Sequence, residues 1–181
     1  MDVQDTLAAA AALLGAAMGG VYFGFSLLVM PGLSRSPDDA ALRVMQQINR
    51  SIRPVFLLLF LGSALVAAAS AVAELVAWQG AVSAWRLAGD VLIVAHFLIT
   101  GAFHIPRNTA VDRLSPDDPA AQRTRRATAR QWTVGNHIRG WSAFLGAAIL
   151  LVTHDRALLE EVHLTRRIEL AAGRIASDEA L

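Results

Sequence analysis

Long apolar stretches constrain this chain more than any other feature of its sequence. Residues 6–30, 54–78 and 83–105 are each long enough to cross the hydrocarbon core of a bilayer, which takes about 20 residues of helix. In a chain of 181 residues with 55% hydrophobic and only 17% charged positions, this pattern is typical of a membrane protein. We therefore predict an all-α fold, a transmembrane four-helix bundle with an additional amphipathic C-terminal helix.

The fourth predicted span is weaker than the others. Its apolar run, residues 141–153, is too short to cross a bilayer alone, so the helix must begin near Val134. This start brings Asn136, His137 and Arg139 into the edge of the membrane. The Arg- and Ala-rich stretch before it, residues 119–131, predicts a separate interfacial or protruding helix.

Prolines predict where the helices begin and end, and the composition of the last residues predicts where the transmembrane domain ends. Pro31 is expected to stop the first helix, Pro54 to open the second, and Pro106 to end or kink the third. Residues 1–154 then form the transmembrane domain. In residues 155–181, four apolar positions fall at helical spacing: Leu164, Ile168, Ala171 and Ile175. They predict an amphipathic helix, with a solvated tail as the alternative.

Charge and composition exclude several functions. There is no cysteine, so disulfides and thiolate chemistry are excluded, and a net charge of +1 argues against a nucleic-acid partner. Eleven of the sixteen arginines fall in the connections after the first and third spans. By the positive-inside rule these connections are cytoplasmic, which predicts a bacterial plasma membrane protein with both termini outside.

Polar side chains gather at the predicted cytoplasmic end of three spans. Asn49 precedes the second span, and His104 and Asn108 lie four residues apart at the end of the third. On the fourth, Trp132, Asn136 and Arg139 share one face, with His137 about 100° away around the helix. The opposite end shows no comparable set. Because ionisable groups at membrane depth usually face a cavity, the sequence predicts a pocket here.

Each of these residues also has a simpler interpretation. Arg139 can extend to lipid phosphates, and Trp132 can belong to an interfacial aromatic belt. Asn108 and Asn136 can bridge helices. His96, in mid-span, is best read as a neutral imidazole satisfied by a neighbouring helix.

Four stretches of the chain resemble the anthrone oxygenases, a family of small four-helix membrane proteins. They are Val29-Met30-Pro31-Gly32-Leu33, Ile48-Asn49-Arg50 leading to Pro54-Val55-Phe56, Phe103-His104-Ile105-Pro106-Arg107-Asn108, and Trp132 through Asn136-His137-Ile138-Arg139. Two positions depart from the family pattern, which usually has Asn at His104 and Trp at Gly135. The glycine is expected to enlarge any pocket, and the histidine to add a titratable group.

The resemblance implies an oxygenase that converts an anthrone to an anthraquinone with O2 as co-substrate and no redox cofactor. Such a site needs a base, an oxyanion stabiliser and a dry apolar pocket. The resemblance favours His137 as the base, with His104 as its rival or partner, and Arg139 as the oxyanion stabiliser. The predicted substrate-binding residues are Asn49, Asn108, Trp132 and Asn136.

Two other functions remain open at this point. Histidines could bind copper, iron or haem, although His96 and His104 lie about 12 Å apart along a helix axis and cannot readily share one ion. A non-catalytic membrane subunit that binds a hydrophobic small molecule would need much the same residues. The expected partners are the lipid bilayer and a hydrophobic substrate, and small residues on the first span would suit a homodimer.

Overall fold

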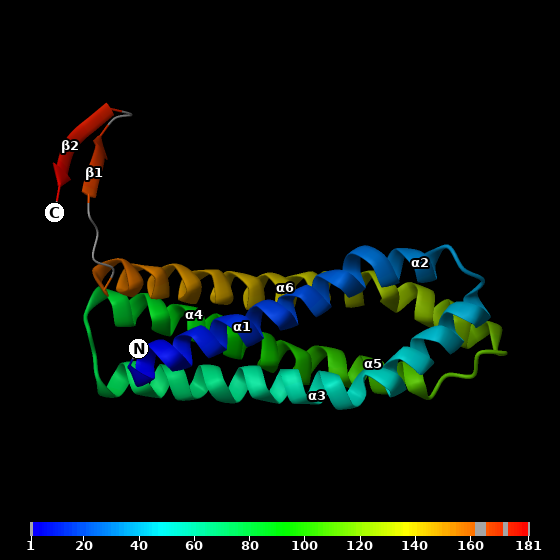
Figure 1. Ribbon diagram of the computed structural model, residues 1–181. Helices are drawn as coiled ribbons and strands as arrows, with labels where there is room; N and C mark the ends of the chain where they lie inside the picture. The colour runs from blue at the N-terminus through cyan, green and yellow to red at the C-terminus, as the bar shows by residue number, and fades with distance from the viewer. Residues whose placement is uncertain (1, 162–165, 172–173, 181) are drawn as a thin grey trace.

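A computed structural model describes residues 2–161, 166–171 and 174–180, with side chains placed through Thr153. Four long helical segments lie side by side along a common direction (Figure 1). The first comprises α1 (Val3–Gly24), η1 (Phe25–Val29) and α2 (Met30–Ser34), and the second is α3 (Asp38–Val76). The third comprises α4 (Ala81–Ile99), η2 (Thr100–His104) and α5 (Ile105–Asp112), and the fourth is α6 (Pro119–Glu161). The predicted helical bundle is thus confirmed.

A π-helical turn precedes each of two prolines, Pro31, which was expected to stop its helix, and Pro106, which was expected to end or kink its helix. η1 ends two residues before Pro31, and η2 ends two residues before Pro106. In each turn the residue preceding the proline donates to a carbonyl five residues back: Met30 to Phe25 and Ile105 to Thr100. The wider turn accommodates a residue that lacks the N–H of a normal helix, so both helices continue. The predicted stop at Pro31 is therefore wrong, and at Pro106 the helix does not end.

Two further helices are longer than the sequence predicted. α3 begins at Asp38 and contains Pro54 in its interior, where a helix start was expected. Its 39 residues extend about 58 Å, well beyond a hydrocarbon core of about 30 Å. α6 likewise joins the predicted interfacial helix to the fourth span. Ion pairs hold the two helices together at this extended end, since Arg125 and Arg126 of α6 each pair with Asp38 of α3.

α6 packs chiefly against α1 and α4, and α3 packs against the other side of the same two helices. Small residues permit the closest contacts. A methyl group on Gly146 would lie 2.7 Å from the backbone oxygen of Gly89, so α4 and α6 touch there backbone to backbone. At Gly15 of α1, the side chain of Ile93 occupies the space that a methyl group would need. By contrast, Gly20 and Gly24 meet nothing within 4 Å.

Three of the helical segments are long and apolar enough to cross a membrane: Val3–Ser34, Asp38–Val76 and Ala81–Asp112. Their outward surfaces carry exposed leucines, such as Leu58 and Leu65 of α3, which suit contact with lipid tails. These features support membrane association. α6 is less apolar than these segments, and its crossing as a fourth span stays a prediction.

The C-terminal region differs from the predicted amphipathic helix. α6 continues to Glu161, and the described residues beyond it form an antiparallel pair, β1 (Arg166–Ala171) and β2 (Arg174–Ala180). The prediction is therefore wrong for these residues. Polar and apolar residues alternate in Arg167-Ile168-Glu169-Leu170, which is the period of two of a β-strand. The same region also has apolar residues three and four positions apart, so the sequence fits a helix equally well. Leu164 lies outside the described residues.

Candidate functional site

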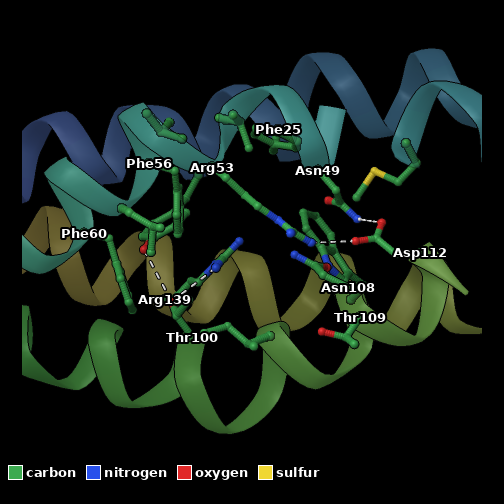
Figure 2. A pocket seen from close by; sticks show the side chains of 17 residues that line it. Phe25, Asn49, Arg53, Phe56, Phe60, Thr100, Asn108, Thr109, Asp112 and Arg139 are labelled. Carbon is green, nitrogen blue, oxygen red and sulfur yellow. Dashed lines mark hydrogen bonds and ion pairs between the residues drawn. The ribbon is translucent and has the colours of Figure 1, made fainter. Parts of the chain in front are cut away.

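A cavity of about 370 Å³ opens between α3 and the other three helical segments (Figure 2). Its volume falls within the range of about 300–1,000 Å³ that small-molecule sites occupy. Most of the wall is apolar or aromatic: Val21, Phe25, Met45, Ile52, Phe56, Leu57, Phe60, Ile105 and Trp132. The polar lining residues are Tyr22, Asn49, Arg53, Thr100, Asn108, Thr109, Asp112 and Arg139.

Arg139 of α6 lies at the closed inner end of this cavity and is only 4% exposed. Its Nε and Nη2 donate to Asn136 Oδ1, and Nη1 donates to Thr100 Oγ1 at 3.2 Å. These bonds use three of the five N–H groups of a guanidinium. No ion pair within the part of the chain with placed side chains includes Arg139. A buried cation is thus held only by neutral groups.

Asn136 fixes the position of Arg139 from behind. Its Nδ2 donates to the Tyr22 carbonyl at 2.6 Å and to Ser26 Oγ at 2.7 Å, so its Oδ1 faces the guanidinium. Ser26 belongs to η1 and Thr100 to η2, so each π-helical turn supplies one oxygen to this network. Such turns often occur at functional sites because they redirect a few side chains within an otherwise regular helix.

A second buried network joins Tyr22 to His96. The Tyr22 hydroxyl lies 3.1 Å from His96 Nδ1, and Ser63 Oγ lies 3.2 Å from Nε2. Both nitrogens of His96 are therefore satisfied by other helices, as the sequence suggested. The Arg139 guanidinium stands over the Tyr22 ring, 4.0 Å from its centroid. Within the described residues, no group of three or more metal-ligating side chains comes together.

The other end of the cavity is organised by Asp112 of α5. Its carboxylate accepts from Asn49 Nδ2 at 2.9 Å and pairs with Arg53 at 2.9 Å (Figure 2). Nearby, Trp132 Nε1 donates to Asn108 Oδ1 at 2.8 Å. Because the indole N–H can only donate, the Asn108 amide must turn its NH2 group away from it. Among the residues with placed side chains, Asn108 Nδ2 and Asn49 Oδ1 have no hydrogen-bond partner and can bind a ligand.

The model of one protein family, described as anthrone oxygenase, matches residues 52–149, more than half of the 181 residues. The chain belongs to the anthrone oxygenase family. The match contains two of the four stretches that carry the sequence resemblance, those at residues 103–108 and 132–139, and the Pro54-Val55-Phe56 part of a third. It leaves out Ile48-Asn49-Arg50 and the stretch around Pro31. Searches of curated proteins and of solved structures found no match.

In this member of the anthrone oxygenase family, four predicted site residues line the cavity: Asn49, Asn108, Trp132 and Arg139. Asn136 does not line it and instead holds Arg139 in place. His104 and His137, the two predicted bases, do not line it either. His137 is half-buried on a different face of α6.

Gly135 does not enlarge the cavity, contrary to expectation. A methyl group on Gly135 would lie 2.6 Å from Phe103 Cε1 and 3.2 Å from His104 Nε2. The ring of Phe103 therefore fills the space that the glycine leaves. His104 is fully buried and packs edge-on against Trp132 at 5.1 Å between centroids. Neither of its nitrogens has a hydrogen-bond partner in the part of the chain that the structure describes.

The sequence analysis missed Tyr22, Thr100 and Asp112. Tyr22 offered a signal, since it is the only tyrosine of the chain and sits deep in a charge-free span. Tyrosines of membrane helices usually lie at the interface instead. Asp112 follows Pro106, where the helix was expected to end or bend, so its position relative to Asn49 could not be predicted.

The far end of the bundle carries a buried polar cluster that the sequence analysis had denied. Arg86 of α4 pairs with Asp5 at 2.6 Å and with Glu74 at 3.2 Å. Gln4 also donates to Glu74. Asp90 lies four residues after Arg86, the spacing of a helical ion pair, but it does not pair with Arg86. Asp90 is buried, and its two carboxylate oxygens have no hydrogen-bond partner among the residues with placed side chains. Glu74 is likewise fully buried inside the bundle.

Proposed function

We propose that this chain is a membrane oxygenase that uses O2 to oxidise an anthrone-like or related phenolic substrate in the cavity beside Arg139. Family membership supports oxygenase chemistry. The substrate class follows from the cavity, whose aromatic side walls suit a flat ring system and whose two polar ends suit carbonyl and hydroxyl groups.

The observation that carries this proposal is the buried guanidinium of Arg139 without a counter-ion. Burying a charge is costly unless an opposite charge or hydrogen bonds compensate it. At Arg139 neutral oxygens supply three hydrogen bonds and no carboxylate supplies charge. The site is therefore prepared for negative charge that appears only when a ligand is present, as an oxyanion does during the reaction.

The reaction requires such an anion. Loss of a proton from the anthrone methylene leaves an electron pair that delocalises onto the carbonyl oxygen, which becomes an oxyanion. This electron-rich anion passes an electron to O2, and the resulting radicals combine to a peroxide at the same carbon. The peroxide takes up a proton to become a hydroperoxide. Its carbon then loses the second C–H proton, the electron pair of that bond forms the quinone C=O bond, and the O–O bond breaks so that hydroxide leaves and combines with the proton as water. One anthrone and one O2 thus yield one anthraquinone and one water.

The protein's tasks in this scheme are to bind, to stabilise charge and to exclude water. Arg139 stabilises the oxyanion with its two unused N–H groups. Trp132 and Phe60 contact the faces of the rings, and Asn49 and Asn108 bind polar groups at the opposite end. O2 is the co-substrate, and the scheme uses no metal or organic cofactor.

The test is O2 uptake by the purified protein in lipid nanodiscs with a hydroxylated anthrone as substrate. Wild-type protein should consume O2 and form the anthraquinone, followed by its absorbance. Arg139→Gln should lower kcat by about 100- to 1,000-fold, as loss of an oxyanion-stabilising donor typically does. Arg139→Lys should retain part of this activity, because the charge remains but the planar donor geometry is lost.

The matched control is Arg126→Gln, which removes an arginine from the same helix but from an exposed position outside the cavity. This variant should keep wild-type kcat. An anthrone that binds to the wild type without O2 uptake would overturn the proposal and favour a non-catalytic binding subunit. Stoichiometric iron or copper in the active protein would favour the metal-dependent alternative.

A further inference from the structure

The cavity presents no imidazole to a substrate, although the proposed reaction needs a base. Neither His104 nor His137 lines it. Asp112 is the only carboxylate among the lining residues, and its two oxygens are taken by Asn49 and Arg53 at the end away from Arg139. At the Arg139 end, the lining groups able to accept a proton are the hydroxyls of Tyr22 and Thr100.

The hydrogen bonds around His96 determine which way its protons point. The Ser63 hydroxyl donates to the Phe60 carbonyl at 3.0 Å, so its oxygen is left to accept from His96 Nε2–H. His96 Nδ1 is then unprotonated, and the hydroxyl 3.1 Å away, that of Tyr22, must donate to it. Thr100 cannot take that role because its own hydroxyl donates to the His96 carbonyl at 2.8 Å.

This arrangement leaves the Tyr22 oxygen as an acceptor at the cavity wall with a proton acceptor directly behind it. We infer that Tyr22 is the catalytic base of the site and that it passes its own hydroxyl proton to His96. The inference rests on the proposed function and supplies the base that this function lacks. Tyr22 touches the substrate, whereas His96 acts through Tyr22 and Ser63 acts by fixing the tautomer of His96.

The step balances as follows. The substrate C–H bond breaks and its electron pair stays on the substrate as the oxyanion. The released proton bonds to the Tyr22 oxygen while the original Tyr22 proton moves to His96 Nδ1, which makes the imidazole a cation. After O2 has added, the proton returns through Tyr22 to the peroxide, and loss of water completes the reaction.

Arg139 connects the base to the oxyanion site. Its guanidinium lies 4.0 Å from the centroid of the Tyr22 ring and also hydrogen-bonds Thr100, whose oxygen lies 3.4 Å from the Tyr22 hydroxyl. A cation at this distance favours negative charge on both the substrate and the tyrosine oxygen during transfer. Proton removal and charge stabilisation therefore occur at one end of the cavity, on the same part of the substrate.

The experiment separates deprotonation from oxidation. Under anaerobic conditions in D2O, exchange of the anthrone methylene protons, followed by NMR, reports deprotonation alone. O2 uptake in air reports the whole reaction. Tyr22→Phe keeps the ring beside Arg139 but removes the hydroxyl, and it should lower both exchange and kcat by about 100-fold or more, with KM changed far less.

Two milder variants test the relay behind Tyr22. His96→Gln should also lower exchange and kcat without a matching rise in KM, and Ser63→Ala should cause a smaller loss because the tautomer is no longer fixed. The matched control is Ser142→Ala, which removes another inter-helix hydroxyl bond, to the Leu92 carbonyl at 2.6 Å, outside the cavity. It should behave as wild type.

The outcomes distinguish this inference from the proposed function. Wild-type activity that persists in Tyr22→Phe, or that is lost in His137→Gln but not in His96→Gln, overturns the relay and leaves the oxygenase intact. If the wild type takes up no O2, the oxygenase proposal fails, and methylene exchange decides the relay. Exchange that depends on Tyr22 and His96 supports it, and absence of exchange overturns it.

Discussion

Two arginines are buried in this bundle to almost the same extent, and their surroundings differ in one respect. Arg86 is 1% exposed and Arg139 is 4% exposed. Arg86 pairs with the carboxylates of Asp5 and Glu74, whereas Arg139 bonds only the neutral oxygens of Asn136 and Thr100. A cavity adjoins Arg139, and Arg86 is not among the residues that line it.

The difference indicates what each arginine does. The charge of Arg86 is already compensated by two carboxylates, so its ion pairs join the ends of α1, α3 and α4 and require no further anion. The charge of Arg139 is compensated only when an anion enters the cavity. The same residue type at the same depth is therefore structural at one end and suited to binding or catalysis at the other.

The largest expected effect is on stability at the Arg86 end. Arg86→Gln leaves two carboxylates near the bundle interior without a cation and should lower the free energy of unfolding by about 3–5 kcal/mol. Arg139→Gln should cost far less, because no buried carboxylate loses its partner. Thermal unfolding of both variants in the same detergent measures this contrast. Equal losses for the two variants would remove the distinction between the two sites.

Asn136→Asp tests the comparison directly by giving Arg139 a counter-ion. The aspartate keeps an oxygen toward the guanidinium but places a negative charge where the substrate oxyanion should be balanced. We expect kcat to fall about 10- to 100-fold, a loss of about 1.4–2.8 kcal/mol in transition-state stabilisation. Unimpaired O2 uptake by a folded Asn136→Asp protein would contradict the assigned role of Arg139. Asn136→Gln, which adds no charge, is the companion variant.

The smallest effect is expected at the cavity mouth, where an ion pair is present but exposed. The Arg53 side chain is 63% exposed, in contrast to 2% for that of Arg86. Exposed pairs contribute about 0–1 kcal/mol, so Asp112→Asn should change stability by no more than this. The same energy corresponds to a change in KM of less than about fivefold. A loss as large as that of Arg86→Gln would show that burial does not distinguish the two pairs.

The sequence predicted the helical bundle well because hydropathy over 20 residues reflects a large and local free energy of transfer. It also placed Asn49, Asn108, Trp132 and Arg139 at one end of the bundle, where all four line the cavity. The sequence-based prediction failed where the surrounding structure changed the effect of a single residue, as at two prolines. Pro31 and Pro106 usually end helices, but here a π-helical turn before each lets the helix continue.

The sequence could not determine which polar side chains meet. Arg86 and Asp90 have the spacing of a helical ion pair, yet Arg86 instead pairs with Asp5 and Glu74 from two other helices. His137 matches the family pattern, yet the rotation of α6 turns Arg139 toward the cavity and leaves His137 out of its lining. Both outcomes depend on the rotation and depth of neighbouring helices.

Hydropathy alone thus determined that the chain folds into long apolar helices with polar groups near their ends. The tertiary structure decided which arginine has a counter-ion, which histidine stands behind a tyrosine, and where the cavity lies. The physical reason is the difference in distance along the chain over which the two kinds of interaction act. Burial of apolar surface is set residue by residue along the chain, whereas hydrogen bonds and ion pairs require atoms from different helices to come within about 3 Å of one another.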